Sequence, residues 1–173
     1  MINKNLIKNI KEKLVYKKIE SPVGVLTIAA TDEALKLLLM NRESGLYEDD
    51  ILKLRKVDSH PILDRTERQI NLYFKGKLKE FDIPLAPEGT EFQKKAWQVL
   101  RTIPYGEVYY YQQQAELVGD SRKARAVGQA NSMNPIAIII PCHRVIEKNG
   151  KLTGFAGGLN VKEYLLQLEK RYR

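Results

Sequence analysis

The alternation of hydrophobic and polar residues in the first half of the chain predicts a small antiparallel sheet. Three strand-sized runs are rich in apolar residues, and short turn-forming segments separate them. The runs span residues 14–20, 25–30 and 35–40, and the turns contain Ser21-Pro22-Val23-Gly24 and Thr31-Asp32-Glu33. Strands joined by such short turns are typical of successive hairpins.

Helical spacing follows the predicted sheet. Apolar residues recur at helical intervals over residues 61–75, and Pro61 suits the first turn of a helix. Residues 77–85 have the composition of one more strand, and residues 84–89, with their proline and glycine, are typical of a linker. These features predict an α/β domain at residues 1–86, followed by a second domain at 87–173.

The pattern of the second half is mainly helical. Thr90 and Gln93 have the spacing of a capping box at the start of its first helix. The predicted helices span residues 90–102, 111–118, 122–132 and 161–171. The middle two, joined by a tight turn at Gly119, have the outline of a helix-turn-helix. An apolar run at residues 136–140 predicts a buried strand.

Basic residues outnumber acidic ones, and the excess is larger in the second half. The formal net charge is +8 at pH 7, with a pI of about 9.5. Residues 1–86 hold 16 basic and 13 acidic side chains, giving +3, whereas residues 87–173 hold 13 and 8, giving +5. A cationic domain favours nucleic acid or another polyanion as its partner, although lysines also serve simply for solvation.

The composition argues against a membrane protein and against a metal protein. No apolar run approaches the ~20 residues of a membrane helix, and the lysine-rich N-terminus does not resemble a signal peptide, so we expect a cytoplasmic protein. The single cysteine excludes an intramolecular disulfide. Cys142, His60 and His143 are too few ligands for a structural zinc site, and no metal or cofactor is expected.

Cys142 is the candidate nucleophile. It closely follows the apolar run at 136–140, and His143 and Arg144 place ionisable groups beside it. Such groups promote the thiolate, which is the nucleophilic form of cysteine. Neighbouring side chains on an extended chain point in opposite directions, so His143 would act on the thiol through a water. The alternatives are an inert buried cysteine and a histidine that only packs.

Several short motifs in the second half occur in an order and spacing typical of a known family. They are Gly89-Thr90-Glu91-Phe92-Gln93, Trp97, Ile103-Pro104-Tyr105-Gly106-Glu107, Arg125-Ala126-Val127-Gly128, Asn134-Pro135, Ile140-Pro141-Cys142-His143-Arg144-Val145 and Gly157-Gly158-Leu159. Together they resemble the O6-alkylguanine-DNA alkyltransferases, also called methylated-DNA–protein-cysteine methyltransferases. The Pro-Cys-His-Arg-Val segment is the most specific. The first half resembles the family only loosely, as its variable α/β N-terminal domain.

The resemblance implies a role for each candidate catalytic residue. Cys142 would accept the alkyl group, His143 would act as a water-mediated base, and Glu169 would orient His143. Without the resemblance, Glu169 would be interpreted as a solvated carboxylate at a helix end.

Two further residues would assist the reaction, again by resemblance. Tyr111 would donate a hydrogen bond to the guanine ring, with Tyr110 as the alternative register in a run of three tyrosines. Asn134 would brace the turn that carries Cys142.

The second predicted helix of the helix-turn-helix implies how DNA would be bound. The target atom lies inside the base stack, so the nucleotide must be rotated out of the duplex. By resemblance, Arg125 would fill the vacated space, and the small residues Ala124, Ala126 and Gly128 would let the helix approach the minor groove closely. The alternative for Arg125 is an ordinary surface arginine.

A glycine-containing loop would line the guanine pocket. The residues assigned to this pocket are Val145, Phe155, Ala156, Gly157 and Gly158. Many relatives have tyrosine where this chain has Phe155, and some have serine where it has Ala156. Loss of these hydroxyls would alter contacts in the pocket or the range of alkyl groups accepted.

The expected function is therefore DNA repair by a protein that acts once and as a monomer on double-stranded DNA. It would move an alkyl group irreversibly from O6-alkylguanine, with O4-alkylthymine as a second candidate substrate. The first alternative is a DNA-lesion binder without catalysis, which would transfer no label. A transcription factor would bind specific sequences in the major groove, and a thiol hydrolase would turn over an ester or peptide.

Overall fold

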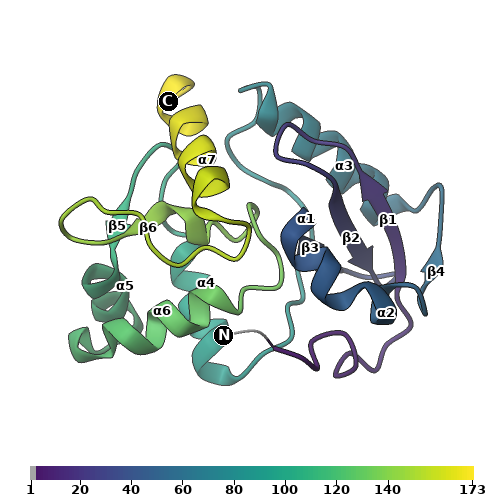
Figure 1. The fold of residues 1–173 in the computed structure, drawn as a ribbon, viewed down its shortest axis with the longest axis horizontal. Helices are drawn as coiled ribbons and strands as arrows, with labels where there is room; N and C mark the ends of the chain where they lie inside the picture. The colour runs from purple at the N-terminus through teal and green to yellow at the C-terminus, as the bar shows by residue number, and fades with distance from the viewer. Residues whose placement is uncertain (1–2) are drawn as a thin grey trace. The chain divides into compact units, whose positions relative to one another are not determined.

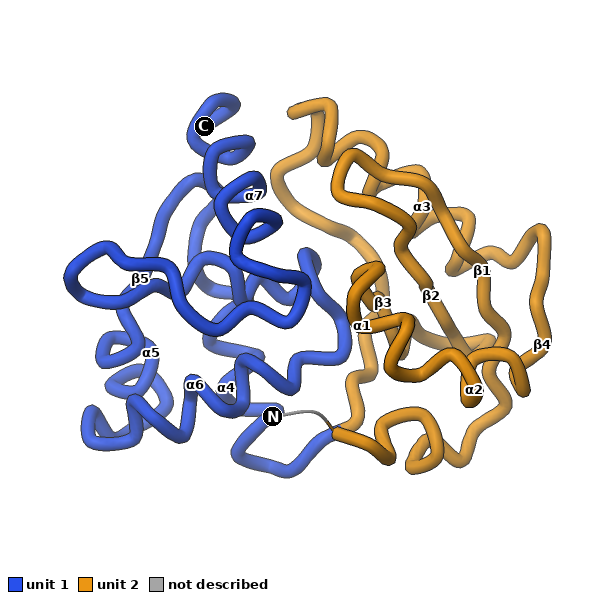
Figure 2. The backbone as a smooth tube through the Cα atoms, viewed as in Figure 1, with its two compact units in different colours: residues 1–2, 89–173 blue, residues 3–88 orange. Residues whose placement is uncertain are grey.

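The computed structural model describes residues 3–173, which form two compact units. Residues 3–88 make up the first unit and residues 89–173 the second, coloured orange and blue in Figure 2. The predicted fold class is confirmed: an α/β unit with a small sheet precedes a mainly helical unit with a helix-turn-helix (Figure 1). None of the described helices is long and apolar enough to cross a membrane.

The first unit is built on a four-stranded sheet. Its strands are β1 (Val15–Ile19), β2 (Leu26–Ala30), β3 (Leu35–Leu39) and β4 (Arg55–Lys56), in the spatial order β3-β2-β1-β4. The first three strands pair antiparallel, which confirms the two predicted hairpins. The short β4 pairs parallel to β1 and makes the sheet mixed. Two exposed basic residues have no hydrophobic periodicity, so the pattern could not reveal this strand.

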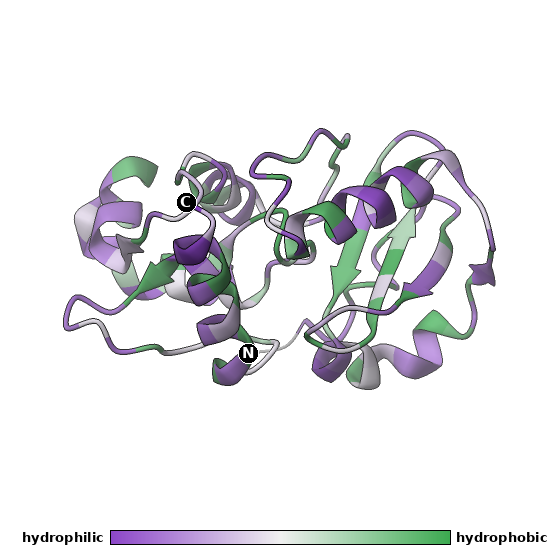
Figure 3. Ribbon diagram, turned by 90° about the horizontal axis from the view of Figure 1, so that it is seen from above, coloured by the Kyte–Doolittle hydropathy of each residue, from purple (hydrophilic) through white to green (hydrophobic). Residues whose placement is uncertain are grey.

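Both faces of this sheet are covered, and for that reason every residue of β2 and β3 is buried. The helix α3 (Pro61–Phe74) packs on β1 and β2. The other face carries α1 (Asn41–Ser44), the 3-10 turn η1 (Gly45–Tyr47) and α2 (Glu48–Ile51) (Figure 1). Two strands of this sheet are accordingly green, and therefore hydrophobic, in Figure 3.

The predicted strand at residues 77–85 is wrong. This segment is a loop with one isolated bridge, between Leu85 and Leu35, in which Leu35 N donates to Pro84 O at 2.8 Å.

The loop ends near an ion-pair cluster. The ammonium group of Lys36, which is almost fully buried, lies 3.1 Å from the carboxylate of Glu12 and 2.8 Å from that of Glu88.

Three helices form the core of the second unit. They are α4 (Glu91–Leu100), α5 (Tyr111–Val118) and α6 (Ala124–Ser132). The predicted capping box is present at the start of α4: Thr90 Oγ1 accepts from Gln93 N at 3.1 Å, and Gln93 Oε1 accepts from Thr90 N at 3.0 Å. Trp97 is buried and donates to Ala130 O at 2.8 Å, which joins α4 to α6.

The connection between α5 and α6 is the turn of the helix-turn-helix. Gly119 ends α5 with φ of 129°, a conformation that glycine adopts without steric penalty. Asp120 then caps the 3-10 turn η2 (Ser121–Lys123) by accepting from Arg122 N at 3.0 Å. The side chains of Gln114 and Asn131 exchange two hydrogen bonds across the buried contact of the helices, at 2.8 and 2.7 Å.

The remaining elements of the second unit surround Cys142. They are β5 (Tyr109–Tyr110), the 3-10 turn η3 (Cys142–Arg144), β6 (Val145–Ile146) and α7 (Leu159–Arg171). The strands β5 and β6 pair in parallel, with Tyr109 opposite Val145 and Tyr110 opposite Ile146. This pairing brings the start of α5 beside the segment that follows the cysteine.

Candidate active site

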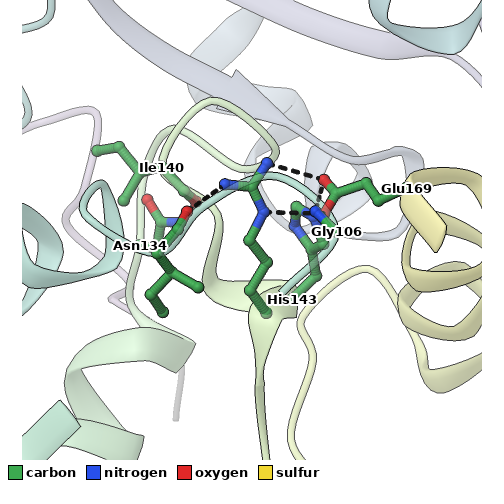
Figure 4. Close-up of polar contacts among 7 residues, drawn as sticks. Gly106, Asn134, Ile140, His143 and Glu169 are labelled. Atoms are coloured by element: carbon green, nitrogen blue, oxygen red, sulfur yellow. Dashed lines mark hydrogen bonds and ion pairs between the residues drawn. The ribbon is translucent and has the colours of Figure 1, made fainter. Parts of the chain in front are cut away.

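Cys142 lies at the end of a buried turn that Asn134 organises. The Asn134 amide donates to Ile140 O at 2.7 Å (Figure 4). Its Oδ1 accepts from Ile136 N at 3.0 Å. Cys142 N donates to Ile140 O at 2.8 Å around Pro141, whose φ of −84° and ψ of 65° define an inverse γ-turn. The side chain of Asn134 thus satisfies backbone groups that have no access to water.

The predicted strand at residues 136–140 is wrong. The segment forms successive turns, in which Ile139 N donates to Ala137 O and Ile140 N donates to Ile136 O. Ile138 has φ of 70°, which is unusual for a β-branched residue. The physical reason is local: the Asn134 side chain and the turn bonds occupy the backbone groups that a strand would need for pairing.

His143 and Glu169 meet in the interior of the second unit. The Nε2 nitrogen of His143 lies 2.7 Å from Oε1 of Glu169, and the two side chains are 0% and 1% exposed. Figure 4 shows Glu169 extending from α7 toward His143 and the backbone of Gly106, whose N–H donates to Oε2 at 3.4 Å.

Opposing effects set the ionisation of this pair. Burial alone raises the pKa of Glu169, but the charges and hydrogen bonds of His143 and Arg144 outweigh burial and hold the pKa of this carboxyl well below its usual range. Burial lowers the pKa of His143, aided by the charges of Arg144 and Lys162 and opposed by Glu169. At neutral pH the contact is therefore a hydrogen bond from a neutral imidazole to a carboxylate, and the charge of His143 acts on Glu169 only once the imidazole is protonated.

The tautomer of His143 follows from this contact. An ionised carboxylate only accepts hydrogen bonds, so Nε2 carries the hydrogen and Nδ1 holds the free lone pair. No hydrogen-bonding group in the described part of the chain contacts the buried Nδ1. His143 is therefore prepared to accept a proton at Nδ1, and Glu169 would stabilise the imidazolium that results.

Arg144 completes the environment of Glu169. Its Nε donates to Oε2 at 2.9 Å and its Nη2 donates to Oε1 at 3.0 Å, while Nη1 donates to Ile103 O at 2.7 Å. The guanidinium carbon also lies 5.7 Å from the centre of the Tyr105 ring. Sequence reasoning treated Arg144 as a neighbour of the thiol and missed its bidentate pairing with Glu169.

Lys162 is a second site residue that sequence reasoning missed. It is fully buried on α7, and Nζ donates to Val145 O at 2.6 Å and to Thr153 O at 3.0 Å. Burial lowers its pKa, whereas Cys142, when it is a thiolate, and the carboxylate of Glu147 act in the opposite direction. Its position on the apolar stripe of α7, three residues before Leu165, was the available signal.

An open groove of about 450 Å³ lies in front of α6. Its lining residues are Tyr111, Ala124, Arg125, Gly128, Gln129, Ser132, Glu147, Thr153 and Gly154. Tyr111 donates from its hydroxyl to Thr153 O at 3.3 Å, and burial raises its pKa. Tyr110, the alternative register, lies on β5, is exposed and does not line the groove.

The groove face of α6 contains Ala124, Arg125 and Gly128 but not Ala126. Arg125 is exposed, and it has no ion pair within residues 3–173. A Cβ atom on Gly128 would lie 3.6 Å from the Tyr111 ring, so the helix backbone and this ring are in close contact.

The five residues assigned to the guanine pocket lie outside this lining. Val145, Phe155 and Gly158 are buried, and Ala156 and Gly157 are half-buried. The loop reaches the groove through Glu147, Thr153 and Gly154, which sequence reasoning did not select. No grouping of three or more His, Cys, Asp and Glu side chains within residues 3–173 is arranged to hold a metal ion.

Two family models match the chain. A model described as 6-O-methylguanine DNA methyltransferase, ribonuclease-like domain, matches residues 14–87. A model described as 6-O-methylguanine DNA methyltransferase, DNA binding domain, matches residues 91–171. The chain belongs to the 6-O-methylguanine DNA methyltransferase family.

Individual members of this methyltransferase family are similar over nearly the whole chain. A methylated-DNA–protein-cysteine methyltransferase of Methanosarcina acetivorans is 47% identical over 90% of this chain and 98% of its own length. The crystal structure of the Mycobacterium tuberculosis O6-methylguanine methyltransferase is similar with a TM-score of 0.84 and 44% identity, covering 92% of this chain and 94% of that one. The structure of M. tuberculosis OGT in complex with DNA gives 0.81 and 43%, covering 91% and 94%.

Proposed function

We propose that this chain repairs DNA by moving the alkyl group of O6-alkylguanine to Cys142. The observation that carries the proposal is the buried His143–Glu169 contact next to the only cysteine, which leaves His143 Nδ1 available as a base. Family membership supports the reaction class, since relatives are named methylated-DNA–protein-cysteine methyltransferases. The chain is thus a DNA-binding methyltransferase of DNA repair.

The proposed reaction is a displacement at the alkyl carbon. The thiol proton of Cys142 passes through a water to Nδ1 of His143, and Glu169 stabilises the imidazolium. The thiolate forms a bond to the alkyl carbon while the bond from that carbon to guanine O6 breaks. The electron pair stays on the guanine, which takes up a proton from water at a ring nitrogen while the Tyr111 hydroxyl donates a hydrogen bond to the ring. The imidazolium of His143 returns its proton to water.

The product explains why each molecule acts once. An S-alkylcysteine is a thioether without a good leaving group, and Cys142 is the only cysteine in the chain, so no second thiol of the protein can release the alkyl group.

O4-alkylthymine is the second candidate substrate. The reaction uses no cofactor in this proposal, and the cytoplasm is the proposed compartment.

The proposed partner is double-stranded DNA, bound by a monomer through residues 87–173. The groove in front of α6 combines an exposed arginine with the small residues Ala124 and Gly128. Small residues favour close approach to a minor groove, and Arg125 would occupy the space that the rotated nucleotide leaves. Asn134 would hold the turn of Cys142 in place, and residues 1–86 would support this domain.

Intact-protein mass spectrometry after mixing with DNA that contains O6-methylguanine tests the proposal. We expect a gain of one methyl group that maps to Cys142, restored guanine and no second turnover. Tight lesion binding without a change in mass would instead favour the DNA-lesion binder.

A further inference from the structure

Glu147 is an unexpected residue in a groove that would face DNA. Among the described residues that line this groove it is the only acidic one, and it follows directly after β6. A carboxylate on a DNA-binding surface repels the phosphate backbone, so it weakens non-specific binding. Its presence indicates that this part of the groove binds a group other than a DNA phosphate, one that interacts favourably with a carboxylate.

Hydrogen bonds hold Glu147 in place. Its backbone N donates to Lys151 O at 3.2 Å, and its backbone O accepts from Gly150 N at 2.8 Å, which closes a tight turn. The hydroxyl of Thr153 donates to Oε1 of Glu147 at 3.0 Å. A carboxylate can accept several hydrogen bonds, so Thr153 fixes its orientation and leaves capacity for a ligand.

Thr153 also connects Glu147 with the hydroxyl of Tyr111. The Thr153 carbonyl accepts from Tyr111 Oη at 3.3 Å, while the Thr153 hydroxyl holds Glu147. The negative charge of Glu147 acts on both Tyr111 and Lys162. A tyrosine hydroxyl and a carboxylate acceptor therefore lie on either side of one residue, at the wall of one groove.

The minor-groove edges of the bases differ in one donor. Adenine and thymine present only acceptors there, whereas guanine adds its 2-amino group. We propose that Glu147 is a specificity residue that accepts a hydrogen bond from the 2-amino group of the alkylated guanine. The same carboxylate repels the O2 acceptor of O4-alkylthymine. The inference rests on the proposed alkyl transfer and identifies which alkylated base the site favours.

Three lesions in one duplex sequence test the inference: O6-methylguanine, O6-methylhypoxanthine, which lacks the 2-amino group, and O4-methylthymine. Single-turnover rate constants are measured for the wild type, Glu147→Gln and Glu147→Met. The matched control is Glu163→Gln, which removes an exposed carboxylate from α7. Ratios of rate constants within one protein remove the general gain in DNA affinity that follows loss of a negative charge.

We expect the preference for O6-methylguanine over both other lesions to fall about fivefold or more in Glu147→Met. The preference of Glu147→Gln, which keeps one acceptor oxygen, should lie between those of the wild type and Glu147→Met. The preference of the control should match that of the wild type. Equal preferences in the wild type and both Glu147 variants would overturn the role of Glu147 alone. A wild type that leaves Cys142 unmethylated by O6-methylguanine would overturn the proposed function itself, before any variant is compared.

Discussion

The Nε2 nitrogen of His143 lies 2.7 Å from Oε1 of Glu169, in a part of the second unit where neither side chain reaches solvent. The carboxylate comes from α7, 26 residues further along the chain. It also binds the guanidinium of Arg144 and the backbone of Gly106. The helix α7 therefore contributes to the fold and also orients the imidazole. It carries two residues, Lys162 and Glu169, whose substitution should impair the protein.

Replacing Glu169 with glutamine should impair both the reaction and the fold. The change leaves the buried Arg144 without its counter-charge, so we expect a loss of about 3 kcal/mol in the free energy of unfolding at pH 7. Urea unfolding measures this loss of stability. The alkylation of Cys142 by O6-benzylguanine should also be slower in the variant. Glu163→Gln, on the exposed side of α7, should change neither.

The stability effect of Glu169 should depend on pH in one direction. The pKa of this carboxyl is lowered in the folded protein, so its contribution is fully present above the unfolded value and is lost as pH falls toward the folded one. The advantage of the wild type over Glu169→Gln should therefore shrink below about pH 4. A stability advantage of the wild type that grows on acidification would contradict a lowered pKa of Glu169 in the folded protein.

The proposed role of His143 as a base predicts how the reaction rate depends on pH. Its pKa is lowered from 6.5 by burial, so the neutral, proton-accepting form predominates at neutral pH. The acid limb of the rate with O6-benzylguanine should have its midpoint below 6.5. This limb should vanish in His143→Gln, together with most of the rate. A wild-type midpoint above 6.5 would be evidence against a neutral resting imidazole.

The exposed arginine on α6 should matter for duplex DNA and not for the chemistry. Arg125→Ala removes the side chain that would fill the space of the rotated nucleotide, so repair in a duplex should slow about tenfold or more. Reaction with free O6-benzylguanine should stay the same. Arg122→Ala, at an exposed arginine paired with Asp120, is the control. Equal slowing on both substrates would exclude the proposed role.

Lys162→Met should slow alkyl transfer about tenfold while the chain still folds. The change removes the donor to Val145 O and Thr153 O and a positive charge that interacts with Cys142. Rates with O6-benzylguanine measure the loss, and circular dichroism checks the fold. Lys170→Met, at an exposed position on the same helix, should react at the wild-type rate.

Gly89→Ala should destabilise the second unit. A Cβ atom would lie 2.5 Å from Cη2 and 2.7 Å from Cζ3 of Trp97, a side chain that is fixed in the core. Overpacking of this kind lowers the free energy of unfolding by about 1–3 kcal/mol. Gly45→Ala, where φ is −60° and no atom lies within 4 Å, should change stability little. Thermal unfolding of both variants makes the comparison.

Local patterns predicted the elements whose structure depends on neighbours in the chain. The hairpins of β1–β3, the capping box of Thr90 and the turn at Gly119 all follow from residues a few positions apart. The run at 136–140 is the instructive exception. Its apolar residues match a strand, but the Asn134 side chain holds Ile136 and Ile140 in a turn that hydrophobicity alone does not encode.

By itself, the sequence determined the two-part architecture, the family motifs and the identity of the single thiol. Only the tertiary structure decided which charged side chains are buried in the domain that carries this thiol. Lys162 and Glu169 are charged residues of the kind that usually lie on the solvated face of a helix, yet both are buried. Partners from distant segments, His143, Arg144 and the carbonyl of Val145, offset the desolvation of these charges. Such compensation exists only once the chain has folded: the apolar stripe of α7 indicates that Lys162 can be buried, but it does not reveal the partners that Lys162 finds there.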